Sequence, residues 1–113
     1  MMNRIPTDPT KREAYELETM LKVAEFTEEV NNIPAGNKAE YRSRCMTGIV
    51  RSSLTTTDEA GKDIEYSVER SQHGTTYREV FSIAVCPGWR YEVSYEEFNY
   101  CLMLLGRNAR LSN

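Results

Sequence analysis

The sequence predicts one α+β domain in which two helices pack on a curled antiparallel sheet, with the element order α-β-β-β-β-α. Two observations lead to this fold class. Apolar residues recur every three or four positions near both ends of the chain and alternate with polar residues in the middle. The predicted strands are joined by connections of hairpin length, which link antiparallel neighbours. The length of 113 residues suits one domain, and we assign residues 1–9 to an N-terminal arm and residues 10–113 to the domain.

The first predicted helix covers residues 11–30. Asp8 or Thr10 is its expected N-cap, because either side chain can accept a hydrogen bond from a free backbone N–H of the first turn. Residues 31–36 contain an X-Pro step and a glycine, and both oppose continuation of a helix. The helix therefore ends near residue 30.

This helix carries apolar side chains on two opposite faces. We expect the face with the leucines to pack on the sheet, because its members follow helical spacing; they are Ala14, Leu17, Met20, Leu21 and Ala24. The other apolar face is then left outside, or it is sheltered by the second helix or by the N-terminal arm. Its members are Tyr15, Val23, Phe26 and Val30.

Four segments show the properties of strands. Residues 64–69 alternate most regularly, and residues 76–85 are rich in β-branched and aromatic side chains. A short strand at 90–93 follows the turn signal Pro87-Gly88. Residues 41–50 also alternate, so they are predicted as the first strand of the sheet.

A second helix is predicted from Tyr95 to Leu105. Ser94 and Glu97 match a capping box before it, and Gly106 is expected as the residue that follows its last turn. The side chains expected to point inward are Tyr95, Phe98, Cys101, Leu102 and Leu105. Tyr100 and Met103 are expected on the outward side, together with Glu96 and Asn99.

The sequence contains no pattern that indicates catalysis, a cofactor or a metal. Cys45, Cys86 and Cys101 are widely spaced and odd in number, so we expect reduced, mostly buried thiols rather than disulfides. His73 is the single histidine, and there is no C-x-x-C pair, so the usual spacing of zinc ligands is missing. No nucleotide-binding or hydrolase motif is present. We therefore predict no catalytic residue, no metal ligand and no cofactor.

Charge and hydropathy narrow the classes of partner. The net charge of −3 does not favour a nucleic-acid binder, although residues 36–57 are locally basic. The longest apolar run, Cys101–Leu105, is far shorter than the roughly 20 residues of a membrane span. The first residues lack the apolar core of a secretory signal. We expect no membrane partner and a cytoplasmic location.

Two functions remain open. The first is a small non-enzymatic regulator or inhibitor, of the kind that phages and mobile elements encode, which binds a protein partner or a second copy of itself. Aromatic and methionine side chains on exposed helix faces are typical of such surfaces. The expected contact residues are Tyr15, Val23, Phe26, Val30, Tyr100 and Met103.

The alternative is a protein that binds or hydrolyses a small anion such as phosphate or polyphosphate. Arg42 and Arg44 are two residues apart on a predicted strand, so their side chains share one face of the sheet. Glu65 and Glu69 share a face in the same way, and a solvated surface with weak ion pairs is the simpler interpretation of that pattern.

Overall fold

The computed structural model describes residues 5–33, 49–58, 60–73, 76–86 and 88–112, and every structural statement below refers to these residues. It confirms the predicted α+β class and the order α-β-β-β-β-α, with an antiparallel sheet that is not closed into a barrel. The elements are α1 (Pro9–Asn31), β1 (Ile49–Thr57), β2 (Asp63–His73), β3 (Thr76–Cys86), β4 (Arg90–Val93) and α3 (Tyr95–Gly106).

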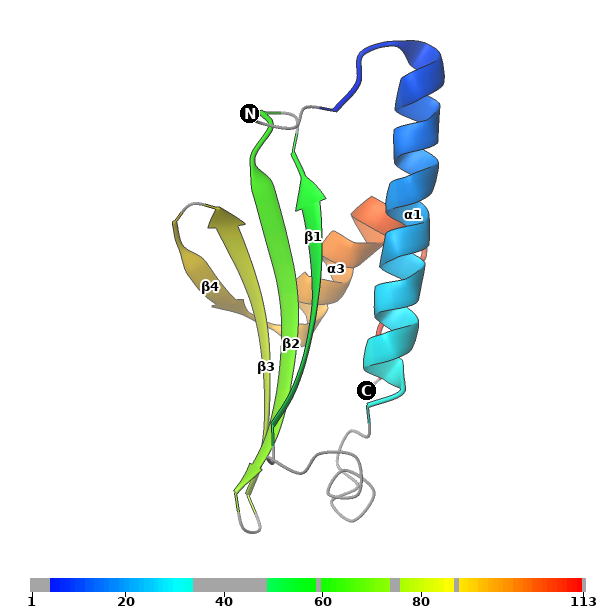
Figure 1. Cartoon of the computed structure of the whole chain (residues 1–113). Helices are drawn as coiled ribbons and strands as arrows, with labels where there is room; N and C mark the ends of the chain where they lie inside the picture. Colours follow the sequence, from blue (N-terminus) through cyan, green and yellow to red (C-terminus); the bar gives the residue numbers. More distant parts are fainter. Residues whose placement is uncertain (1–4, 34–48, 59, 74–75, 87, 113) are drawn as a thin grey trace.

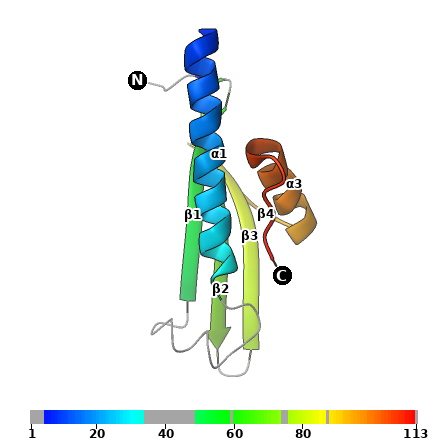
Figure 2. The same cartoon turned by 90° about the vertical axis from the view of Figure 1, so that its right-hand side faces the viewer.

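The sheet is a meander in which each strand pairs with its neighbour in sequence, β1-β2-β3-β4. The predicted strands at 64–69, 76–85 and 90–93 are confirmed. β1 begins at Ile49, so most of the predicted strand 41–50 lies outside the described residues. Both helices cover the same face of the sheet, as Figures 1 and 2 show, and the opposite face is open.

The core lies between the helix layer and the sheet. The ring of Phe98 is at its centre, with ring centroids 6.3 Å from Phe26, 6.1 Å from Tyr66 and 5.3 Å from Phe81. Tilted and edge-to-face pairs of this kind are favourable beyond the area that they bury. The other core side chains are Val23, Val30, Leu54, Val68, Leu102 and Leu111.

The prediction for the two faces of α1 is wrong. Val23, Phe26 and Val30 belong to the core, whereas Leu17 and Leu21 are exposed. The side chains next to each apolar face of α1 explain which face is buried. The side chains beside Val23 and Phe26 on the sheet side include threonines, whose hydroxyls bond to the backbone of the preceding turn and so tolerate burial. The leucines instead lie among charged residues, which must stay in water.

The ends of α1 are stabilised in different ways. Asp8 is the N-cap, as predicted, and its carboxylate accepts hydrogen bonds from the backbone N–H groups of Thr10 and Lys11 at 3.0 and 3.2 Å. At the other end, the guanidinium of Arg70 from β2 donates to the carbonyl oxygens of Val30 (2.8 Å) and Ile33 (3.3 Å). A cation at a helix C-terminus is favoured by the helix dipole.

Arg70 is itself buried, with 1% of its surface exposed. Its Nε donates to Oε2 of Glu79 on the neighbouring strand at 2.6 Å. The two residues are directly opposite each other in the register of β2 and β3. The ion pair and the two carbonyl contacts therefore connect the sheet to the end of α1.

α3 crosses close to α1. Ser94 is its N-cap, as predicted, and accepts from the backbone N–H of Glu97 at 3.1 Å. Gly106 is the last helical residue rather than the one that follows it. A Cβ on Gly106 would lie 2.4 Å from Cγ1 of Val23, so the glycine allows the two helices to approach.

The residues after α3 complete the core. Leu111 is buried, its N–H donates to Oδ1 of Asn99 at 2.9 Å, and its carbonyl accepts a hydrogen bond from the hydroxyl of Tyr95. Asn99 is thus buried under this segment, and the prediction that it lies on the outward side of α3 is wrong.

Candidate functional site

One exposed apolar surface of the helix layer lies on the outer side of α1. We call Ala14, Leu17, Leu21 and Ala24 the outer stripe. All four are exposed, and the exposed fractions of Leu17 and Leu21 are 55% and 65%. Their spacing of three, four and three residues places them along one side of the helix, opposite the core face. Two large leucines in water on a helix surface are a candidate contact with another molecule.

The charged residues of α1 are only partly paired. Arg12 and Glu16 form an ion pair of 3.1 Å, and Lys22 and Glu18 form one of 3.5 Å, both at i,i+4 spacing on the surface. Exposed pairs of this type contribute about 0.3–0.5 kcal/mol each. The side chains of Lys11 and Glu25 have no ion-pair partner within the part of the chain that the structure describes.

α3 adds a second exposed apolar area. Tyr100 is 57% exposed and Leu104 is 67% exposed, one helical turn apart. The prediction that Tyr100 faces outward is confirmed, and Met103 beside it is half-buried.

A groove separates the first half of α1 from the end of β1 and the end of α3. It has a volume of about 400 Å³, within the range of small-molecule sites. Tyr15 crosses it, because the tyrosine hydroxyl donates to the carbonyl oxygen of Thr57 at 2.9 Å. The other side chains that line it are Ile5, Arg12, Glu16, Thr19, Met20, Thr56, Leu104, Leu105 and Arg107.

The contact residues predicted from the sequence do not form one surface in the structure. Tyr15 is half-buried in the groove wall, and Tyr100 and Met103 are on α3. The core positions of Val23, Phe26 and Val30 leave them unavailable to a partner, so their prediction as contact residues is wrong. Arg42 and Arg44 lie outside the described residues.

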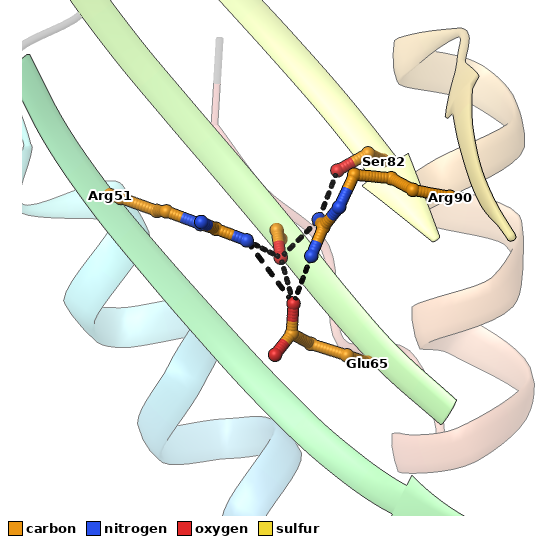
Figure 3. A network of polar contacts seen from close by, with 5 residues as sticks. Arg51, Glu65, Ser82 and Arg90 are labelled. Atoms are coloured by element: carbon orange, nitrogen blue, oxygen red, sulfur yellow. Dashed lines mark hydrogen bonds and ion pairs between the residues drawn. The ribbon is translucent and has the colours of Figure 1, made fainter. Parts of the chain in front are cut away.

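The open face of the sheet carries a polar network. Arg51 from β1 and Arg90 from β4 approach Oε1 of Glu65 from opposite sides, at 3.2 and 2.6 Å (Figure 3). The hydroxyl of Ser67 lies between them, donates to Glu65 at 3.1 Å and accepts from Arg90 at 3.2 Å. Arg90 also donates to the hydroxyl of Ser82 at 2.9 Å.

The arginines of this network stabilise the charged form of Glu65. The hydrogen bond from Arg90 is the largest cause that lowers the pKa of Glu65 below its ordinary value, and partial burial opposes it. The adjoining hollow of about 310 Å³ also contains the carboxylates of Glu69 and Glu92. Because the arginines already face a carboxylate and more carboxylates surround them, an added anion would meet repulsion here.

Thiol and metal chemistry have little support in the described residues. Cys101 is half-buried against the core, and burial followed by the nearby Glu97 raises the pKa of its thiol, which keeps it protonated. Cys45 lies outside the described residues, and the structure describes the backbone of His73 and Cys86 but not their side chains. Within the described ranges, no three His, Cys, Asp or Glu side chains gather as ligands of a metal ion would.

Comparisons with known proteins add no family to this geometry. No family model, no curated protein and no solved structure matches the chain. Of the helices in the described part of the chain, neither has the length and apolar character required to span a membrane.

Proposed function

We propose that this chain is a small non-enzymatic interaction protein that binds a protein partner, or a second copy of itself, through the exposed apolar side of its helix layer. Its role would be that of a regulator or inhibitor, of the kind that phages and mobile elements encode. The observation that carries the proposal is the exposure of Leu17 and Leu21 in the middle of α1. The surface that contributes is the outer stripe, with Tyr100 and Leu104 on α3 beside it.

The physical argument concerns the free energy of hydration. Burying a leucine side chain that was exposed is favourable by about 1.5–3 kcal/mol when burial is complete. Leu17 and Leu21 gain only part of this free energy on folding, because more than half of each residue's surface stays in water. A lysine, glutamate or glutamine at either position would form the helix about as well as leucine, so the leucines are better explained by a contact with another molecule.

The alternative, anion binding at Arg42 and Arg44, concerns residues outside the described part of the chain, and the described open face of the sheet does not favour an anion site of its own. In the described strands, Arg51 and Arg90 share the carboxylate of Glu65. Two further carboxylates, Glu69 and Glu92, line the hollow beside them. Tight binding of phosphate usually uses arginines that are free to form paired hydrogen bonds with the ligand.

The test is affinity capture from the source cells, with the double variant Leu17→Ser/Leu21→Ser compared with the wild type. We expect the variant to lose the captured partner or its self-association, and to keep the circular-dichroism spectrum and the melting temperature. Trp89→Ser is the matched control, because Trp89 is an exposed apolar residue in the β3–β4 connection, away from α1. Equal capture by the wild type and the double variant would contradict the proposal.

A further inference from the structure

Arg107 follows α3 in a backbone conformation that usually belongs to glycine. Its φ is 47° and its ψ is 119°, and Asn108 after it also has a positive φ, of 52°. Among the described residues, these two are the only non-glycine residues with a positive φ. A side chain in this region is strained, whereas glycine adopts it freely. The chain therefore keeps a long cationic side chain at a position where glycine would be more stable.

The turn after α3 accounts for the backbone at this position but not for the arginine. It lets the chain return over the helices so that Leu111 reaches the core, and Gly106 already removes the Cβ that would meet Val23. Neither contact uses the guanidinium of Arg107. This side chain is exposed and forms no ion pair or hydrogen bond with the rest of the described chain. A strained residue of this kind is typical of a site that holds a ligand.

The groove between α1, β1 and α3 contains one cation that no carboxylate neutralises. Its charged lining residues are Arg12, Glu16 and Arg107. Arg12 pairs with Glu16 at 3.1 Å, so these two charges cancel. Two arginines and one glutamate leave the groove with a net charge of +1, although the whole chain has a net charge of −3. The groove is thus complementary to a ligand with a single negative charge.

The remaining walls of the groove offer apolar surface to such a ligand. Leu104 is 67% exposed, and Ile5, Met20 and Leu105 are half-buried. Along α1 the groove extends from Arg12 to Met20, which is about 12 Å at the rise of an α-helix. A medium-length hydrocarbon chain has a similar extent. Covering this surface would remove apolar area from water and so favour binding.

From the unneutralised cation and the apolar walls we infer that the groove binds a fatty carboxylate of medium chain length. Its carboxylate accepts two parallel hydrogen bonds from the guanidinium of Arg107, and its chain lies along Leu104 and Met20. The volume of about 400 Å³ is sufficient for such a molecule. This inference goes beyond the proposed function, because it assigns a small ligand to the groove and leaves the outer stripe to the protein partner.

The test is a methyl NMR titration of the full chain with hexanoate, octanoate and decanoate. The signals of Met20 and Leu104 should shift, and those of Leu54 in the core should stay fixed. For decanoate the dissociation constant is expected in the range of about 10 μM to 1 mM. Each methylene added to the probe should tighten binding by up to about fourfold, because it covers more of the apolar wall.

Variants separate the charged end of the site from its apolar wall. Arg107→Gln should weaken decanoate binding about tenfold and leave binding of the neutral analogue decanol unchanged. The matched control is Arg110→Gln, because Arg110 is also exposed but lines a different hollow; its affinity should stay within about twofold of the wild type. Leu104→Ser should weaken decanoate and decanol alike. Leu21→Ser, at an equally exposed leucine outside the groove, should change neither.

Arg107→Gly separates a role in binding from a role in folding. Glycine relieves the strained backbone, so this variant should melt at a higher temperature while it binds decanoate about tenfold more weakly. A lower melting temperature would show that the arginine stabilises the fold, and would overturn the argument from strain.

Three binding results would also overturn the inference. One is the absence of shifts at Met20 and Leu104 with millimolar decanoate. Another is an equal loss of affinity in Arg107→Gln and Arg110→Gln, which would indicate attraction by net charge alone. The third is decanol bound as tightly as decanoate, because the cation would then have no part in recognition. None of these results bears on the proposed function, which the capture experiment with Leu17→Ser/Leu21→Ser tests separately.

Discussion

Replacing Arg70 by methionine tests how the sheet holds α1. Methionine keeps most of the aliphatic volume and removes the guanidinium, so the carboxylate of Glu79 loses the partner at 2.6 Å. The carbonyl oxygens of Val30 and Ile33 lose their contacts with Arg70 at the same time. The change therefore isolates the polar contribution of one buried side chain.

The magnitude follows from burial. Arg70 is almost fully buried and the side chain of Glu79 is 19% exposed, so water replaces the lost contacts poorly. Breaking a buried ion pair by removing one partner reduces the free energy of unfolding by about 3–5 kcal/mol. A domain has a total stability of about 5–15 kcal/mol, and the melting temperature should fall by roughly 10–20 °C.

The assay is urea denaturation followed by circular dichroism, with Arg51→Met as the matched control. Arg51 also pairs with a glutamate, but its side chain is 47% exposed, so we expect a loss below about 0.5–1 kcal/mol. Adding Glu79→Leu to Arg70→Met removes the stranded carboxylate and should recover at least about 1 kcal/mol. A loss below about 1 kcal/mol in Arg70→Met, or no recovery in the double variant, would refute the reasoning.

Three further predictions concern single positions. Gly106→Ala should lower stability by about 1–3 kcal/mol in thermal unfolding, because the new Cβ meets Val23; an unchanged melting temperature would show that the helices are not so close. Ser52→Ala should raise the melting temperature, because the buried Ser52 hydroxyl has no hydrogen-bond partner in the described structure; a decrease would reveal one. The lowered pKa of Glu65 means that its contribution to stability is present above its ordinary value of 4.5 and is lost as the pH falls through the folded-state pKa. As the pH falls below about 6, the free energy of unfolding should therefore decrease less steeply for Glu65→Gln than for the wild type. Parallel pH curves for the two proteins would contradict the ion-pair network.

The sequence was sufficient to predict both helices and three of the strands, because local signals determine them, whereas β1 (Ile49–Thr57) overlaps the predicted strand 41–50 only at Ile49 and Val50. Asp8 and Ser94 are capping residues whose side chains bond within the next turn, and such contacts depend on a few neighbouring positions. Alternation along 64–69 likewise reflects a strand with one buried face, and Tyr66 and Val68 are buried.

The orientation of α1 could not be predicted from apolar spacing, because both faces contain apolar residues at helical intervals. A usable signal was the charge beside each stripe. Glu18, Lys22 and Glu25 surround the leucines, whereas Thr19 and Thr27 adjoin the face that is buried. Counting charges on each side of the helix, as well as apolar residues, would have selected the correct core face.

The polar contacts that depend on tertiary structure could not be predicted from the sequence. Arg70 follows Tyr66 and Val68 on the buried face of β2, and only the position of α1 shows that its guanidinium meets the end of a helix. Arg51 and Arg90 are 39 positions apart in the chain and meet Glu65 because three strand pairings bring them together. Leu111 follows the last helix in a segment without regular structure, so periodicity gives no indication of its burial.

The measurement that tests the central claim most directly is methyl NMR of the leucines as the protein concentration rises from micromolar to millimolar. If the outer stripe binds a second copy, the methyl signals of Leu17 and Leu21 should shift progressively, because these side chains become buried in the contact. The methyl signals of Leu54 and Leu102 should stay fixed, since both are already in the core of the single chain. Fixed signals for Leu17 and Leu21 in a sample that nevertheless self-associates would contradict the claim that the outer stripe of α1 is the interaction surface.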